Sequence, residues 1–167
     1  NATNDHAPRD FEVVTGMMSD LTFGQTGFRF VRVELIEGEW AMMQSIYAVC
    51  TLPSFDREAK ITTNDALLNE ILDTAAYTLK LNCQNGYIWD GIKRDRLVWI
   101  GDLNPEIATI KAVFGYDESV PNSLDFAKSE FPPTSWINTF PSYSMWWIIN
   151  HYEWYMQNGN LEYLKEQ

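Results

Sequence analysis

Carboxylates, cationic side chains and indole rings stand close together in residues 84–106, QNGYIWDGIKRDRLVWIGDLNPE. The segment holds carboxylates at Asp90, Asp95 and Asp102 and large rings at Trp89 and Trp99. Sugars are bound by such a set, because charged side chains hold their hydroxyl groups while aromatic rings stack on their apolar faces. Glycoside hydrolysis needs two carboxyl groups, an acid for the leaving oxygen and a base or nucleophile opposite. The segment therefore predicts a carbohydrate site, and its composition equally allows an ion-pair cluster that ties two helices together.

The spacing of three of these residues allows two local structures. Asp95, Trp99 and Asp102 stand at i, i+4 and i+7, so a helix would place them on one face. Gly101 and Pro105 limit how far that helix could extend. Without a helix, the segment is a loop of roughly 20 residues between two helices, and such long loops are usually functional. In both cases the three side chains are expected to converge on one small volume.

The elements that position this segment change in type along the chain. Residues 26–52 are predicted to form strands, since GFRFVRVELIEG alternates apolar and polar residues and SIYAVCTL is β-branched and aromatic-rich. Beyond residue 63 the apolar period is 3.6, which predicts helices over about 64–82, 104–115, 120–130 and 142–158 and the start of another after Asn160. Thr63 or Asn64 is expected to cap the first helix, and Pro105 to open the second. This order predicts a mostly α chain with an N-terminal β portion, divided into residues 1–55 and 56–167.

The composition restricts the classes of partner. The 167 residues carry a formal net charge of −11, which argues against nucleic acid and anionic membranes because both require basic patches. No run of 18 apolar residues predicts a membrane span, and no signal peptide is apparent in residues 1–20. Cys50 and Cys83 form no metal-ligand spacing, so neither a metal nor another cofactor is expected. The chain begins in mid-pattern and stops inside a predicted helix, which suggests a piece of a longer protein.

The stretch DGIKRDRLVWIGD, residues 90–102, resembles the signature loop of the α-L-rhamnosidases of glycoside hydrolase family 78. In that family the pattern runs roughly Asp-Cys-Pro-x-Arg-Asp-Glu-Arg-x-Gly-Trp-x-Gly-Asp. The flanks are similar as well: GFRFVRVE to the strand that closes the family's β-sandwich, SFDREAKITTNDALLNEI to the join into its first barrel helix, and PTSWINTFPSYSMWWIINHYEWYMQNGN to the stretch that follows. The resemblance covers roughly residues 24–167. It implies the last strands of a β-sandwich followed by the first helices of an incomplete (α/α)6 barrel.

The resemblance implies substrate-binding roles for five residues. Asp90 and Asp102 match carboxylates that hold rhamnose hydroxyls, and Arg94 matches the arginine of the same loop. Trp99 matches a ring that walls the sugar pocket. Trp136 and the helix after it would come near that pocket.

The general acid of the family is the glutamate after Arg-Asp, and this chain departs from the pattern there. Either Asp95 takes its place, with a side chain one methylene shorter, or Arg96 does and the acid is lost. Glu106 is a fallback acid, although its expected place at a helix N-terminus would favour the charged form. The family's general base comes from a much later part of the barrel, so it is expected beyond residue 167, in the remainder of the same polypeptide.

The implied activity is inverting, metal-free hydrolysis that releases terminal α-L-rhamnose from rhamnosides or polysaccharides, in a secreted or periplasmic bacterial enzyme. The chain by itself is expected to be inactive, because the base is absent, and to self-associate through the open inner faces of its helices. Two alternatives remain open. One is a non-catalytic carbohydrate-binding protein on the same barrel, which the missing glutamate favours, and the other is a helical interaction domain in which the loop is only an ion-pair clasp.

Overall fold

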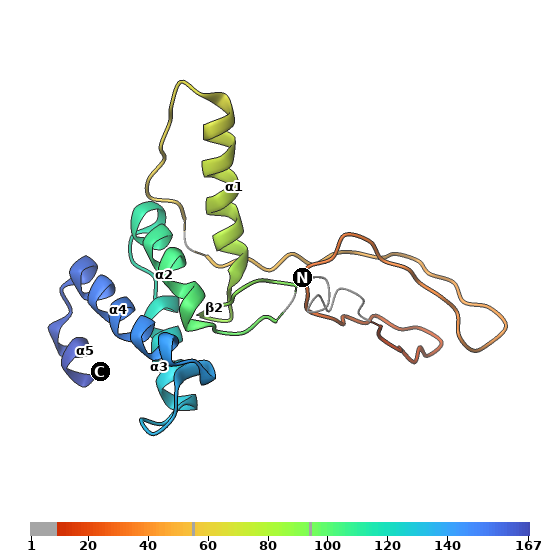
Figure 1. The fold of residues 1–167 in the computed structure, drawn as a ribbon. Helices are drawn as coiled ribbons and strands as arrows, with labels where there is room; N and C mark the ends of the chain where they lie inside the picture. The colour runs from red at the N-terminus through yellow and green to blue at the C-terminus, as the bar shows by residue number, and fades with distance from the viewer. Residues whose placement is uncertain (1–9, 55, 94) are drawn as a thin grey trace.

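The computed structural model describes residues 10–54, 56–93 and 95–167, and within them the chain is mostly helical with one small antiparallel sheet (Figure 1). The helices are α1 (Ala66–Asn82), α2 (Ile100–Thr109), α3 (Ser119–Glu130), α4 (Pro141–Asn158) and α5 (Leu161–Glu166). A π-helical turn, η2 (Ile110–Phe114), continues α2, and a 3₁₀ turn, η3 (Ile137–Thr139), precedes α4. The sheet pairs β1 (Cys83–Gln84) with β2 (Tyr87–Ile88).

Residues 10–54 form no strand in the structure, so the two strands predicted within residues 26–52 are absent. The segment instead extends away from the helices as open loops (Figure 1) and leaves apolar side chains in solvent, with Phe30 86% and Val49 76% exposed. An alternating strand is stable only when a sheet pairs with it and buries its apolar face, and an isolated pair of strands is marginal in water. The alternating pattern in residues 26–52 favours strands, but residues 10–54 provide no sheet with which such strands could pair.

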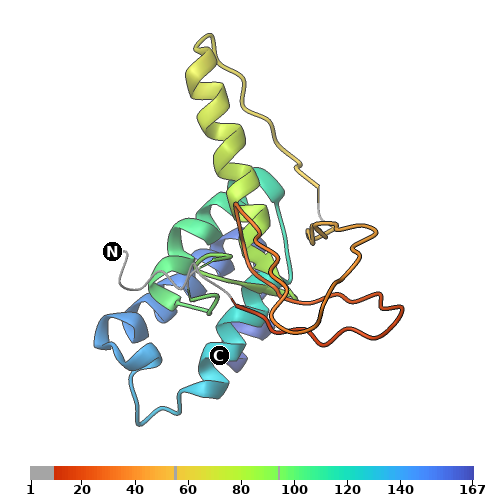
Figure 2. The ribbon, with the colours of Figure 1, turned by 90° about the vertical axis from the view of Figure 1, so that its right-hand side faces the viewer.

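The N-cap of α1 is neither of the predicted residues, Thr63 or Asn64, but the next residue, Asp65. The side chain of Asp65 accepts hydrogen bonds from the N–H groups of Leu67 (2.9 Å) and Leu68 (3.1 Å), which makes Asp65 the N-cap. The N-terminal part of this helix projects away from the other helices in both ribbon views (Figures 1 and 2), while its C-terminal part lies beside α2. Most of its predicted apolar stripe is therefore open, and only Ala76 and Leu79 are buried.

Helix α2 begins at Ile100, four residues before the predicted start, so Pro105 lies inside the helix and does not open it. The N–H of Ile100 donates to Asn138 Oδ1 (3.2 Å), and Asn150 Nδ2 donates to the Ile100 carbonyl (3.3 Å). These partners come from η3 and α4. Residues far away in the sequence thus determine where α2 begins, whereas the local pattern predicted a start four residues later.

Three helix boundaries agree with the sequence prediction. Gly115 (φ 74°) follows η2, and Gly159 (φ 67°) follows α4, both with positive φ values that favour glycine. Asn160 caps α5, since its side chain accepts the N–H of Tyr163 at 3.1 Å. These boundaries depend on backbone conformation within one turn, which neighbouring residues determine.

The core lies where α2 packs against α4, with β2 and α3 covering the other sides (Figure 2). Its most buried apolar side chains, each at most 1% exposed, are Ile88, Ile100, Leu103, Ile107, Ile110, Val120, Leu124 and Trp154. The core thus holds the start of α2, and the loop before it, in place. Across residues 10–54, 56–93 and 95–167, no helix has both the length and the apolar character to cross a membrane.

Candidate functional site

The segment 84–106 folds as a hairpin, an irregular loop and a helix. The two strands pair with Cys83 opposite Ile88, and α2 starts at Ile100, so the irregular part spans residues 89–99. Asp95 precedes the helix. The helical face that would have combined Asp95, Trp99 and Asp102 is therefore not formed.

Asp90 closes the loop on itself. Its N–H donates to the Leu97 carbonyl (2.9 Å), and its Oδ1 accepts the N–H of Leu97 (2.9 Å). The loop is also tied to the N-terminal segment, since the N–H of Gly27 donates to the Ile92 carbonyl at 2.7 Å. Asp95 lies within this closed loop and is half-buried. Asp90, which is predicted to bind sugar hydroxyls, thus stabilises the conformation of the loop that carries it. Arg94 of the same loop lies outside the described residues.

Trp99 packs under the start of α4. Its ring centroid is 6.4 Å from that of Phe140 and 6.1 Å from that of Tyr143, which it meets edge-on at 86°. The indole N–H is buried and has no hydrogen-bond partner among the described residues. Trp136, from the connection that leads to α4, is 57% exposed. Trp99 therefore packs against the aromatic residues at the start of α4, whereas the ring of Trp136 is open to solvent.

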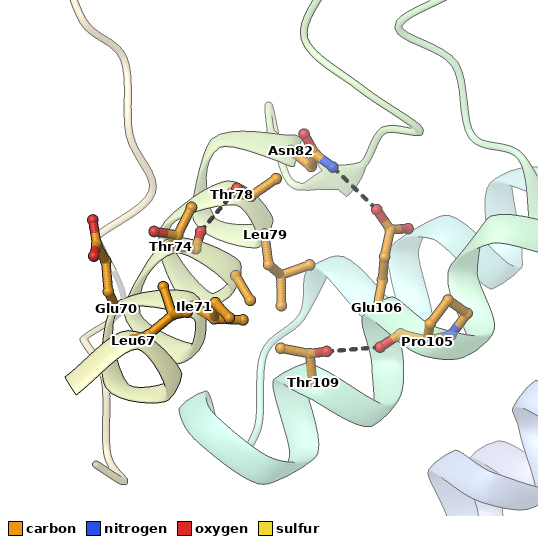
Figure 3. Close-up of a pocket in the computed structure, with 11 residues that line it drawn as sticks. Leu67, Glu70, Ile71, Thr74, Thr78, Leu79, Asn82, Pro105, Glu106 and Thr109 are labelled. Carbon is orange, nitrogen blue, oxygen red and sulfur yellow. Dashed lines mark hydrogen bonds between the residues drawn. The ribbon is translucent and has the colours of Figure 1, made fainter. Parts of the chain in front are cut away.

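Glu106 lies in the second turn of α2, because the helix begins six residues earlier than this side chain. It faces α1 across a groove between the two helices (Figure 3). Its Oε1 accepts a hydrogen bond from Asn82 Nδ2 at 3.2 Å, and its Oε2 is buried without a hydrogen-bond partner among the described residues. The expectation that a helix N-terminus would keep Glu106 charged is wrong, since this carboxyl is not at the helix end.

Burial raises the pKa of Glu106 to about 8. The hydrogen bond from Asn82 lowers this pKa, and the charges of Asp102 and Asp90 raise it. The charges of Asp102 and Asp90, two carboxylates singled out in the sequence, thus act on the carboxyl group of Glu106. A pKa of about 8 favours the protonated form of Glu106 at neutral pH, which is the form that a general acid requires.

The groove beside Glu106 has a volume of about 640 Å³. One wall is the open face of α1 from Leu67 to Asn82, and the other is formed by Pro105, Glu106 and Thr109 of α2 (Figure 3). Cavities of this size commonly hold a small molecule. The sequence predicted a helix with an apolar period of 3.6 over residues 64–82 and assigned none of its residues to a site. The polar residues between the apolar positions were the signal that could have indicated the α1 wall.

The described residues contain no group of three or more His, Cys, Asp or Glu side chains arranged to hold a metal ion. Comparison of the chain with protein-family models, with curated proteins and with solved structures gives no match. The roles expected from the resemblance therefore stay predictions.

Proposed function

We propose that this chain is part of a glycoside hydrolase that releases terminal α-L-rhamnose from rhamnosides or polysaccharides with inversion of configuration. The substrate class comes from the resemblance of residues 90–102 to the family 78 loop. The observation that carries the chemistry is the buried carboxyl of Glu106, with a pKa of about 8, beside the charges of Asp90 and Asp102. An acid of this strength stays protonated at neutral pH and donates as the glycosidic bond breaks.

Glu106 is proposed as the acid in preference to Asp95. Burial supplies the raised pKa that an acid catalyst needs, as in other glycosidases where a carboxyl in an apolar setting takes this role. Asp102 stands one helical turn before Glu106, at i and i+4 on the same face of α2, where it can hold a sugar hydroxyl. The base that activates water lies, in this proposal, in the remainder of the polypeptide.

The proposed architecture is an incomplete (α/α)6 barrel, residues 56–167, after the last strands of a β-sandwich, residues 1–55. The succession of helices from α1 to α5 supports the first part. Exposed apolar side chains in residues 10–54, such as Ile36 at 77%, support the second, because they would be covered once a sheet pairs with them. The same proposal places the protein outside the bacterial cytoplasm.

The test is hydrolysis by the longer polypeptide that contains this chain. Release of L-rhamnose from an aryl α-L-rhamnoside is followed by NMR, which also reports the anomer formed first. Glu106→Gln is expected to lower turnover by orders of magnitude on an alkyl rhamnoside and much less on a nitrophenyl rhamnoside, whose leaving group needs little proton assistance. Glu130→Gln, exposed on α3, is the matched control.

The same assay decides between Glu106 and Asp95. If Asp95→Asn shows the dependence on leaving group and Glu106→Gln does not, Asp95 is the acid. A uniform loss on both substrates assigns the altered residue to binding or structure. Rhamnoside binding without any hydrolysis would favour the second candidate, a non-catalytic carbohydrate-binding protein, which the absence of the family's glutamate from the loop supports.

A further inference from the structure

We infer that the groove between α1 and α2 binds an uncharged, hydroxyl-bearing ligand beside the hydrogen-bonded side chains of Asn82 and Glu106, and that α1 thereby forms one wall of the substrate site. This inference rests on the proposed function for the class of ligand, a neutral glycoside. No residue of α1 was assigned to the site by the family resemblance, so the groove extends the site beyond the loop of residues 90–102.

The groove has the volume and the lining of a small-molecule site. Its volume of about 640 Å³ lies within the range in which proteins bind ligands of this size. Leu79 and Ile71 line its apolar part, while Asn82 and Glu106 face each other at one end (Figure 3). An apolar surface with a few convergent polar groups suits a sugar ring, which presents C–H faces and hydroxyl edges.

The polar groups at that end are incompletely satisfied by the protein. Glu106 Oε2 is buried and has no hydrogen-bond partner among the described residues, a situation that costs free energy. A ligand hydroxyl placed there would pair with the carboxyl group. The hydroxyl of Thr109 donates to the Pro105 carbonyl at 2.8 Å, which leaves its oxygen lone pairs directed toward other donors. The site can therefore both donate to and accept from hydroxyl groups.

The charges around the groove select against anions, and the burial of Glu106 disfavours pairing of a cation with that carboxyl group. Asp90 and Asp102 lie close enough to raise the pKa of Glu106, and Glu70 belongs to the α1 wall, so an anion would be repelled. A cation would require Glu106 to ionise while buried, and both charges would then lose their hydration. An uncharged ligand avoids both costs.

The binding test uses methyl α-L-rhamnoside and saturation-transfer NMR at pH 6 and pH 9.5. We expect binding at pH 6 and at least several-fold weaker binding at pH 9.5, because Glu106 loses its proton above about pH 8. Glu106→Gln keeps a neutral donor, so its binding should be the same at both pH values. Thr78→Trp, at an exposed groove position, should abolish binding, whereas Tyr77→Trp, outside the groove on the same helix and 53% exposed, should retain it.

Three results would overturn the inference: no binding at pH 6, binding that survives Thr78→Trp, or binding of the unaltered chain that is independent of pH. Preferential binding of methylammonium at pH 9.5 would instead identify a cation site. If the longer polypeptide with Thr78→Trp still hydrolyses the substrate, the proposed function stands and the groove is not part of the substrate site. Groove binding with the expected pH dependence but no hydrolysis would leave the inference standing and remove the enzymatic function.

Discussion

Replacing Glu106 by glutamine tests the buried carboxyl through stability, without reference to any ligand. Folding raises the pKa of Glu106 from its ordinary value of 4.5 to about 8. The folded chain therefore holds the proton more tightly than the unfolded chain. Its contribution to stability is complete below pH 4.5 and is lost as the pH rises through about 8. Glutamine has the same shape and does not titrate, so the variant escapes this loss.

The magnitude follows from the two pKa values. They differ by about 3.5, and at 1.36 kcal/mol for each pKa unit this corresponds to about 5 kcal/mol as an upper value. We expect Glu106→Gln and the unaltered chain to be equally stable at pH 4, and the variant to be more stable by several kcal/mol at pH 9. Urea unfolding followed by circular dichroism at pH 4, 6, 8 and 9 measures the difference. Titrating groups that do not interact with Glu106 are common to both chains and cancel.

The control for this experiment is Glu130→Gln, which removes an exposed carboxyl from α3. It should change stability little at any pH. The reasoning would be refuted by a Glu106→Gln difference that is constant from pH 4 to pH 9, or by a variant less stable than the unaltered chain at pH 9. Either outcome would mean that Glu106 ionises in the folded chain as readily as in the unfolded chain.

Three further predictions concern packing. Gly101→Ala should lower stability by about 1–3 kcal/mol in thermal unfolding, because a Cβ there would lie 2.5 Å from the Tyr143 ring; an unchanged Tm would show that the ring moves aside freely. Asn150→Ala, at a fully buried position, should cost about 1–3 kcal/mol in urea unfolding, because it removes the hydrogen bond to the Ile100 carbonyl and the acceptor of Asn104 Nδ2. A loss below about 0.5 kcal/mol would count against these contacts. Ile148→Lys should reduce the expected self-association, measured by sedimentation, because Ile148 and Tyr152 are 64% and 58% exposed on one side of α4. Gln157→Lys, at another exposed position of α4, is the control. The expectation would be contradicted if the unaltered chain is already a monomer.

The helices of this protein could be predicted from the sequence because their signals are local. The 3.6-residue period and the caps at Gly115, Gly159 and Asn160 act through contacts within one or two turns, and the structure confirms them. The loop of residues 89–99 could likewise be singled out, since its density of charges and rings needs no partner to be recognised.

Other features depended on segments far apart in the chain. The strands expected in residues 26–52 required a sheet to pair with, and the start of α2 at Ile100 required side chains from η3 and α4. Glu106 became the strongest acid candidate only because α1 lies across from it and buries it beside Asn82. The order of residues determines which groups can ionise or hydrogen-bond, whereas the pKa of a carboxyl depends on how much water the surrounding fold removes, and that is decided by tertiary packing.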